Sequence, residues 1–227
     1  MVGCPVWYDS EYFNEKFTAP DSKSLVFTPP ANMLFKNQCL DIMERIYKRF
    51  PNYKLYSSFN RGYTADRYTT QAYERSIECI VAKGIELGFE NIDCSYDIEK
   101  INFYNSCDLH IGYRLHSHIH FMSRRVPSFL ISEDSRSNGL NTSLGLPILQ
   151  GEKANVLSDL HSAGNKYIKY VIGRFSSPVK VNPSLGDQLM NTINREITND
   201  FVSFRGIEEK LDWMFENRMA PFLRSLP

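Results

Sequence analysis

The chain has 227 residues, of which 42% are apolar and 13% aromatic, enough to form a packed core in one large or two small domains. Lysine plus arginine and aspartate plus glutamate number 26 each, so the formal net charge is zero. This balance excludes a protein that binds nucleic acid or an acidic membrane surface through a global field. Specificity for an anion has to come from a local site.

The five cysteines are scattered and form no C-x-x-C pair, so the sequence indicates neither a disulfide framework nor a zinc knuckle. The first residues carry acidic side chains and no basic segment followed by an apolar one. No stretch approaches the roughly 20 apolar residues that span a bilayer. We therefore expect a cytoplasmic protein without a transmembrane segment.

The first third of the chain alternates short β-rich stretches with longer periodic ones, which is typical of a parallel sheet covered by helices. The pattern predicts a strand over residues 24–28, a helix over 36–50 and a strand over 54–59. Pro29 and Pro30 end the first strand. The predicted inner face of the helix carries Leu40, Met43, Ile46, Tyr47 and Phe50.

The middle of the chain continues this alternation. It predicts a helix over 66–87, a strand over 91–95, a short helix over 97–105, a strand over 108–112, a helix over 113–125 and a strand over 127–132. Ligands of such sheets bind at the carboxyl ends of the strands. The residues expected at those ends are Thr28, Asn60, Arg61, 95–97, 113–116, Glu133 and Asp134.

The last third is less regular. Residues 133–147 are polar and predict a loop, and residues 148–180 permit no assignment. Helices are predicted over 183–198 and 205–218, the latter with an apolar side. We expect residues 1–178 to form a sheet domain and residues 179–227 to form a C-terminal helical extension that packs on it.

One segment, residues 108–120, combines a strand with a helix that opens on arginine and histidine. A helix N-terminus offers unpaired N–H groups and the positive end of the helix dipole. Arg114, predicted in the first turn, can fork onto a phosphate or carboxylate, and the imidazole of His116 is of a type that transfers protons at neutral pH. The alternative, equally open, is a surface arginine in an ion pair and a histidine bonded to a nearby carbonyl group.

His116, His118 and His120 suggest a zinc site, since positions four apart share a helix face. No Glu-x-x-His or cysteine partner accompanies them, and His118 lies on the apolar side of the predicted helix. We therefore predict no metal site and a core position for His118. Arg61, Glu133 and Asp134, at the ends of other strands, are secondary candidates for the anion site, or else solvated loop charges.

Three stretches resemble the polysaccharide pyruvyl transferase family. They are Gly3-Cys-Pro5 followed by aromatic residues, Cys107-Asp-Leu-His-Ile-Gly-Tyr-Arg-Leu-His116, and Arg125-Val-Pro127-Ser-Phe-Leu-Ile-Ser leading to Gly139-Leu140 and Leu144-Gly145-Leu146. The resemblance covers roughly residues 1–147. It implies a Rossmann-like parallel sheet flanked by helices, similar to one lobe of a GT-B-like fold.

The resemblance also implies an activity: a transferase that moves pyruvyl from phosphoenolpyruvate to a sugar of a surface polysaccharide as a ketal, without cofactor or metal. Residues 1–178 would be the donor-binding domain. His116 would act as acid or base, and the donor-binding residues would be Arg114, Leu115, His116, Arg61, Glu133 and Asp134. The expected partners are phosphoenolpyruvate and a sugar or polysaccharide precursor, including a lipid-linked precursor met at the membrane surface, and no nucleic acid.

Members of that family usually have an N-terminal lobe ahead of the Gly-Cys-Pro segment. The resemblance therefore implies either that the sequence is a fragment or comes from a truncated gene, or that a partner lobe or a second copy of the chain completes the cleft for the acceptor. Two alternatives stay open. One is a lobe of a glycosyltransferase that uses a nucleotide sugar, and the other is a non-catalytic remnant that binds anions or glycans.

Overall fold

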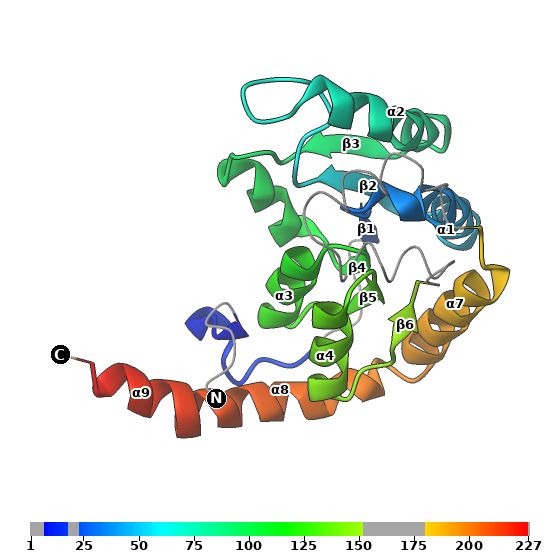
Figure 1. The fold of residues 1–227 in the computed structure, drawn as a ribbon. Helices are drawn as coiled ribbons and strands as arrows, with labels where there is room; N and C mark the ends of the chain where they lie inside the picture. The colour runs from blue at the N-terminus through cyan, green and yellow to red at the C-terminus, as the bar shows by residue number, and fades with distance from the viewer. Residues whose placement is uncertain (1–6, 18–22, 152–179, 227) are drawn as a thin grey trace.

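A computed structural model describes residues 7–17, 23–151 and 180–226 of the chain (Figure 1). Within these ranges six parallel strands form a sheet in the order β3-β2-β1-β4-β5-β6. The strands are β1 (Ser24–Thr28), β2 (Lys54–Phe59), β3 (Glu90–Asp93), β4 (Leu109–Gly112), β5 (Ser128–Ser132) and β6 (Leu149–Gln150). The order reverses between β1 and β4, so the chain has the predicted Rossmann-like α/β fold with its switch point between these strands.

Helices cover both faces of this sheet. They are α1 (Lys36–Arg49), α2 (Gln71–Glu86), α3 (Leu115–Ser123), α4 (Ser135–Leu144), α7 (Pro183–Thr198) and α8 (Val202–Met214). The last helix, α9 (Ala220–Arg224), has no buried residue and extends away from the sheet (Figure 1). Shorter turns are η2 (Ser10–Tyr12), η3 (Met33–Phe35), η4 (Glu99–Ser106) and the π-helical η5 (Phe215–Met219). None of the helices in the described ranges is long and apolar enough to cross a membrane.

The central strand β1 shows how the two faces are filled. All five of its residues are buried, as expected of a strand covered on both sides. Leu25 and Phe27 belong to the large hydrophobic cluster that contains α1 and α7, whereas Val26 belongs to a smaller one beneath η4 and α3. Successive side chains thus point to opposite layers, and β1 forms the centre of the fold.

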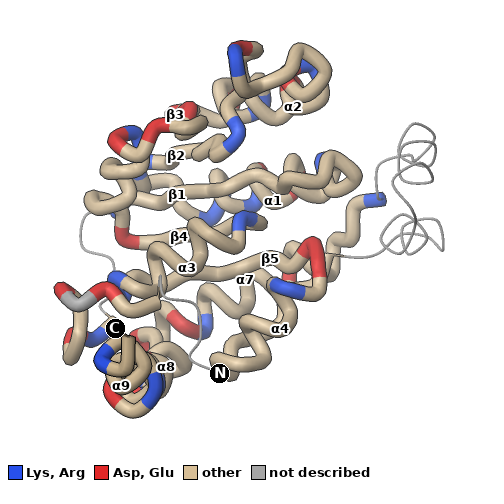
Figure 2. Tube along the Cα trace, turned by 60° about the vertical axis from the view of Figure 1, so that its left-hand side comes forward, with Lys and Arg blue, Asp and Glu red and all other residues tan. Residues whose placement is uncertain are grey.

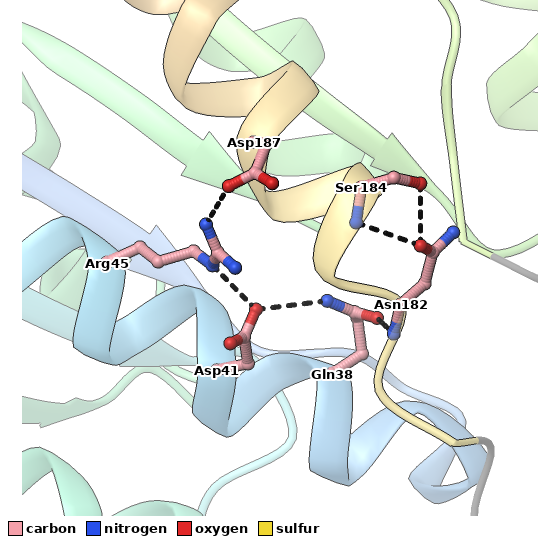
Figure 3. A network of polar contacts seen from close by, with 6 residues as sticks. All are labelled: Gln38, Asp41, Arg45, Asn182, Ser184 and Asp187. Carbon is pink, nitrogen blue, oxygen red and sulfur yellow. Dashed lines mark hydrogen bonds and ion pairs between the residues drawn. The ribbon is translucent and has the colours of Figure 1, made fainter.

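Helix α7 is fastened to α1 by a polar network (Figure 3). The Gln38 side-chain oxygen accepts a hydrogen bond from the backbone N–H of Asn182 at 2.6 Å, and Asp41 accepts one from Arg45 at 2.8 Å. Arg45 in turn pairs with Asp187. Side chains of α7 and α8 join the same hydrophobic core as the sheet, namely Leu185, Leu189, Ile193, Phe204, Ile207 and Leu211.

Three predicted elements agree with the structure at both ends: the strands over 24–28 and 54–59 and the helix over 183–198. The predicted inner face of α1 was partly wrong, because Tyr47 is 48% exposed and Leu40 is half-buried, while Cys39 and Ile42 are fully buried. The two possible stripes share Met43, Ile46 and Phe50, so the spacing alone could not distinguish them.

Two helices begin later than predicted. Helix α2 starts at Gln71 instead of residue 66, because the Asp66 carboxylate accepts the N–H groups of Tyr68 and Thr69 and so closes a turn ahead of the helix. Helix α3 starts at Leu115 and not at 113. Arg114 has an extended backbone and occupies the N-cap position, not the first turn.

Helix α4 replaces the predicted polar loop over 133–147. Its serine, asparagine and glycine residues favour turns over helix, so the pattern was misleading. The informative signals were at its ends, where Asp134 is the N-cap and Gly145, with φ of 79°, ends the helix. Helix α8 spans Val202–Met214 and continues through η5 into α9. The predicted helix over 205–218 therefore covers only part of this continuous run. Residues 152–179, in the segment without assignment, lie outside the described residues.

Candidate anion-binding site

The switch point of the sheet is held by a close pairing of β1 with β4. Gly112 lies beside Thr28, and a Cβ atom on Gly112 would be 2.2 Å from the Thr28 hydroxyl and 2.5 Å from its carbonyl oxygen. Only glycine permits this approach. The backbone N–H of Arg114 donates to the Thr28 hydroxyl at 3.3 Å. The end of β1 therefore fixes the start of α3.

A pocket at this edge of the sheet collects residues from β2 and α2, from the turns after β1 and β2, and from the N-cap of α3. Its lining consists of Pro29, Pro30, Ser58, Phe59, Asn60, Arg61, Tyr73, Ile77 and Arg114. Arg61 and Arg114, far apart in the sequence, thus meet at one pocket. Neither guanidinium forms an ion pair with any residue that the structure describes. The pocket has a volume of about 10 Å³, room for roughly one water molecule, so it is a small recess, and an anion held by the two arginines would lie over it.

Tyr73, from α2, lines the pocket together with these arginines. The Arg61 guanidinium lies 4.5 Å from the centre of the Tyr73 ring. Burial raises the pKa of the Tyr73 hydroxyl, although the positive charges of Arg61 and Arg114 act to lower it. Tyr73 consequently stays protonated at neutral pH and can donate a hydrogen bond to a bound anion.

Glu133, at the end of β5, places a carboxyl group within electrostatic range of Arg114. Its oxygens accept hydrogen bonds from the N–H groups of Ala31 at 3.3 Å and Asn32 at 3.1 Å. Burial raises the pKa of this carboxyl, and the two backbone bonds and Arg114 only partly offset that effect. Glu133 can therefore exchange a proton at a higher pH than an ordinary glutamate.

Glu133 and the remaining predicted site residues lie outside the pocket lining. His116 is exposed in the first turn of α3, and Leu115 packs against the hydrophobic core. Asp134 caps α4 and pairs with Arg136. The pKa of Asp134 is lowered, because the hydrogen bonds from Arg136 and from the backbone outweigh the opposite effect of its burial. Its carboxylate is thus engaged in holding the helix.

Sequence reasoning missed the groups that hold the pocket floor in place. Ser117, in the first turn of α3, donates to the Asn60 side chain at 3.5 Å and contacts the Tyr104 hydroxyl at 3.3 Å. The Tyr104 hydroxyl also lies 2.6 Å from the hydroxyl of Ser58. These groups come from three separate elements, and no sequence spacing relates them. Tyr73 carried only a weak signal, since its position on the inner face of α2 indicated packing.

A buried histidine network lies behind the pocket. His110 Nε2 is 2.9 Å from the Thr28 hydroxyl, and the Ser128 hydroxyl lies 2.6 Å from His110 Nδ1 and 2.7 Å from His118 Nδ1. Burial lowers the pKa of His118 to about 3, and that of His110 is also far below its usual value. Both imidazoles are neutral, and the predicted core position of His118 is confirmed.

The Thr28 hydroxyl accepts from the backbone N–H of Arg114. Because a hydroxyl can accept two hydrogen bonds and donate one, the bonds that join Thr28, His110, Ser128 and His118 can run in either direction with both imidazoles neutral. The network therefore links the start of α3 to the core without a charge. In the part of the chain that the structure describes, no three His, Cys, Asp or Glu side chains are grouped to hold a metal ion.

The site thus combines two arginine side chains without carboxylate partners, a tyrosine hydroxyl and a carboxyl group of raised pKa at the switch point of the sheet. These groups bring positive charge and groups that can donate a proton to one edge of the sheet. No protein-family model and no curated protein sequence matches the chain. The function is accordingly inferred from the geometry of the site and the motif that it contains.

Proposed function

We propose that the chain binds phosphoenolpyruvate over the recess lined by Arg61 and Arg114 and transfers its pyruvyl group to a sugar as a ketal. The observation that carries the proposal is that these two arginines line one pocket without a carboxylate partner among the described residues. Phosphoenolpyruvate has a phosphate and a carboxylate, and each can accept a pair of hydrogen bonds from one guanidinium. The resemblance of residues 107–116 to polysaccharide pyruvyl transferases agrees with this substrate.

The proposed reaction has a balanced course. A proton adds to the methylene carbon of phosphoenolpyruvate and makes C2 electrophilic. Two sugar hydroxyls then form C–O bonds to C2 in turn, and the bond from C2 to the phosphate oxygen breaks. Of the two hydroxyl protons released, one restores the catalytic acid and the other leaves with the phosphate. Arginine side chains fixed on the donor stabilise the phosphate as it departs.

Two residues are candidates for the catalytic acid. His116 was proposed from the sequence, and its exposed side chain in the first turn of α3 faces away from the core. The carboxyl of Glu133 interacts with Arg114, and burial raises its pKa. We propose Glu133 as the proton donor and His116 as the group that receives a proton from the acceptor hydroxyl.

The first turn after β1 favours phosphoenolpyruvate over a nucleotide sugar. In dinucleotide-binding sheets the diphosphate takes backbone N–H groups of a glycine-rich turn at this place. Here the turn opens with Pro29 and Pro30, which have no N–H to donate. The anion must instead be held by side chains, as the two arginines allow.

Thermal unfolding and phosphate release test the proposal together. We expect phosphoenolpyruvate to raise the midpoint of unfolding and UDP-glucose to leave it unchanged. Phosphate release from phosphoenolpyruvate with a panel of sugars should fall in both Glu133→Gln and His116→Asn. Glu133→Gln should also remove the basic limb of the pH profile that Glu133 sets, because a proton donor has to be protonated to act. Stabilisation by UDP-glucose and none by phosphoenolpyruvate would overturn the proposal.

A further inference from the structure

Two exposed tyrosines stack on each other at the edge of the sheet that bears the anion pocket. Tyr68 belongs to the loop between β2 and α2, and Tyr96 to the loop after β3. Their ring centroids are 4.2 Å apart with 29° between the ring planes, and the residues are 51% and 66% exposed. Stacking hides one face of each ring, and the Arg67 guanidinium lies over the Tyr68 ring, so the outer face of the more exposed Tyr96 is the one that stays open to solvent. Contiguous exposed apolar surface of this kind marks interaction sites.

Both rings are held in place by their loops. The Asp66 carboxylate accepts the N–H of Tyr68 at 2.7 Å, and Asp93 accepts the N–H of Ser95 at 2.9 Å, next to Tyr96. Tyr96 itself has φ of 52°, a backbone conformation that residues other than glycine adopt at an energetic cost. The aromatic surface is therefore formed before any ligand arrives, which reduces the entropy lost on binding.

The stacked pair is joined to the anion pocket by short connections. The Thr69 hydroxyl donates to the carbonyl oxygen of Arg61 at 2.6 Å, so Tyr68 and the pocket arginine belong to one tied loop. Gly62 in this loop lies against Ser95, and a Cβ atom on it would be 3.0 Å from the Ser95 hydroxyl. Both loops leave the sheet at the same edge (Figure 1). A ligand on the tyrosines would thus be a neighbour of an anion held by Arg61.

Charged groups border the aromatic face. The Arg67 guanidinium lies 5.4 Å from the centre of the Tyr68 ring, and Asp97 follows Tyr96 directly. Figure 2 shows both signs of charge along this part of the chain, near β2 and β3. The combination fits a sugar ring, because the C–H groups of a pyranose stack on an aromatic face while its hydroxyls bond to carboxylates and cations at the rim.

We propose that the Tyr68–Tyr96 pair is the platform on which the sugar ring of the acceptor stacks, beside the donor pocket. Its role for an acceptor rests on the proposed function, whereas its capacity to bind a sugar does not. Saturation-transfer NMR tests it with methyl β-D-galactopyranoside, methyl β-D-glucopyranoside and methyl α-D-mannopyranoside. The variants are Tyr68→Ala and Tyr96→Asn, the latter because asparagine tolerates a positive φ. Tyr47→Ala is the control, since Tyr47 is 48% exposed on α1.

We expect ring C–H protons of at least one glycoside to receive saturation from the native chain. Affinity should be roughly fivefold to tenfold weaker in both platform variants and unchanged in Tyr47→Ala. The platform is refuted if no glycoside binds or if both variants bind glycosides as the native chain does. It is also refuted if uridine, run in parallel, is the only ligand whose binding depends on the tyrosines.

Titration of phosphoenolpyruvate separates the two proposals. Glycoside binding without phosphoenolpyruvate binding refutes only the proposed function, and phosphoenolpyruvate binding without glycoside binding refutes only the platform.

Discussion

The buried histidines behind the anion pocket make the fold sensitive to mild acid. His118 stays neutral in the folded chain down to about pH 3, because burial lowers its pKa, whereas in the unfolded chain it takes up a proton near its usual value of 6.5. The folded state therefore binds fewer protons, so the free energy of unfolding falls as the pH drops from 6.5 towards 3. From His118 alone the loss between pH 7 and pH 5 is about 2 kcal/mol.

Urea unfolding at a series of pH values measures this contribution. Replacing His118 with glutamine removes the titrating group and keeps an amide that can accept the Ser128 hydrogen bond. We expect His118→Gln to be less stable than the native chain at pH 7, and this deficit should shrink by about 2 kcal/mol at pH 5. The control is Met122→Ala, which truncates a fully buried side chain of α3 and should lower the free energy of unfolding equally at both pH values. An unchanged deficit in His118→Gln would refute the assignment of a neutral buried imidazole.

Further substitutions test the close packing of the site. Gly112→Ala should lower the free energy of unfolding in urea by about 3 kcal/mol or more, because the new Cβ atom would fall 2.2 Å from the Thr28 hydroxyl of β1. The control Gly139→Ala, on α4 with open space around it, should be neutral or stabilising. Equal effects would contradict this reading of Gly112. Ser128→Ala leaves two buried imidazole nitrogens without a partner and should cost about 3 kcal/mol, which calorimetric unfolding can measure, and a cost near zero would contradict the network.

Much of the fold could be predicted because local signals agreed with tertiary structure. The buried strand β1 and the helix α7, with Asn182 and Pro183 at its start, are readable from short segments. Helix α4 could not be predicted in this way, since its polar sequence forms a helix only with Asp134 and Gly145 as caps and packing against β5. The predicted starts of α2 and α3 were too early. The Asp66 side chain closes a turn before α2, and the extended backbone of Arg114 delays the start of α3.

The site shows the same division. The sequence placed Arg61, Arg114 and Glu133 at the carboxyl edge of the sheet, because strand ends can be located from pattern alone. It could not show which of these charges already have partners. Asp134 is engaged by Arg136, whereas Arg61 and Arg114 meet at one pocket, and this difference depends on side-chain geometry. Nor could it relate Tyr73 to the arginines, since that contact joins α2 to the loop after β2.

Calorimetric titration of phosphoenolpyruvate tests the central claim that Arg61 and Arg114 form its binding site. We predict that Arg61→Gln and Arg114→Gln each weaken binding about tenfold to a hundredfold, as expected for a charge-assisted hydrogen bond, and that the double variant binds no phosphoenolpyruvate measurably. Arg136→Gln, which removes an arginine already paired with Asp134, should bind as the native chain does. Native binding in Arg61→Gln and Arg114→Gln, or no binding by the native chain, would contradict the account.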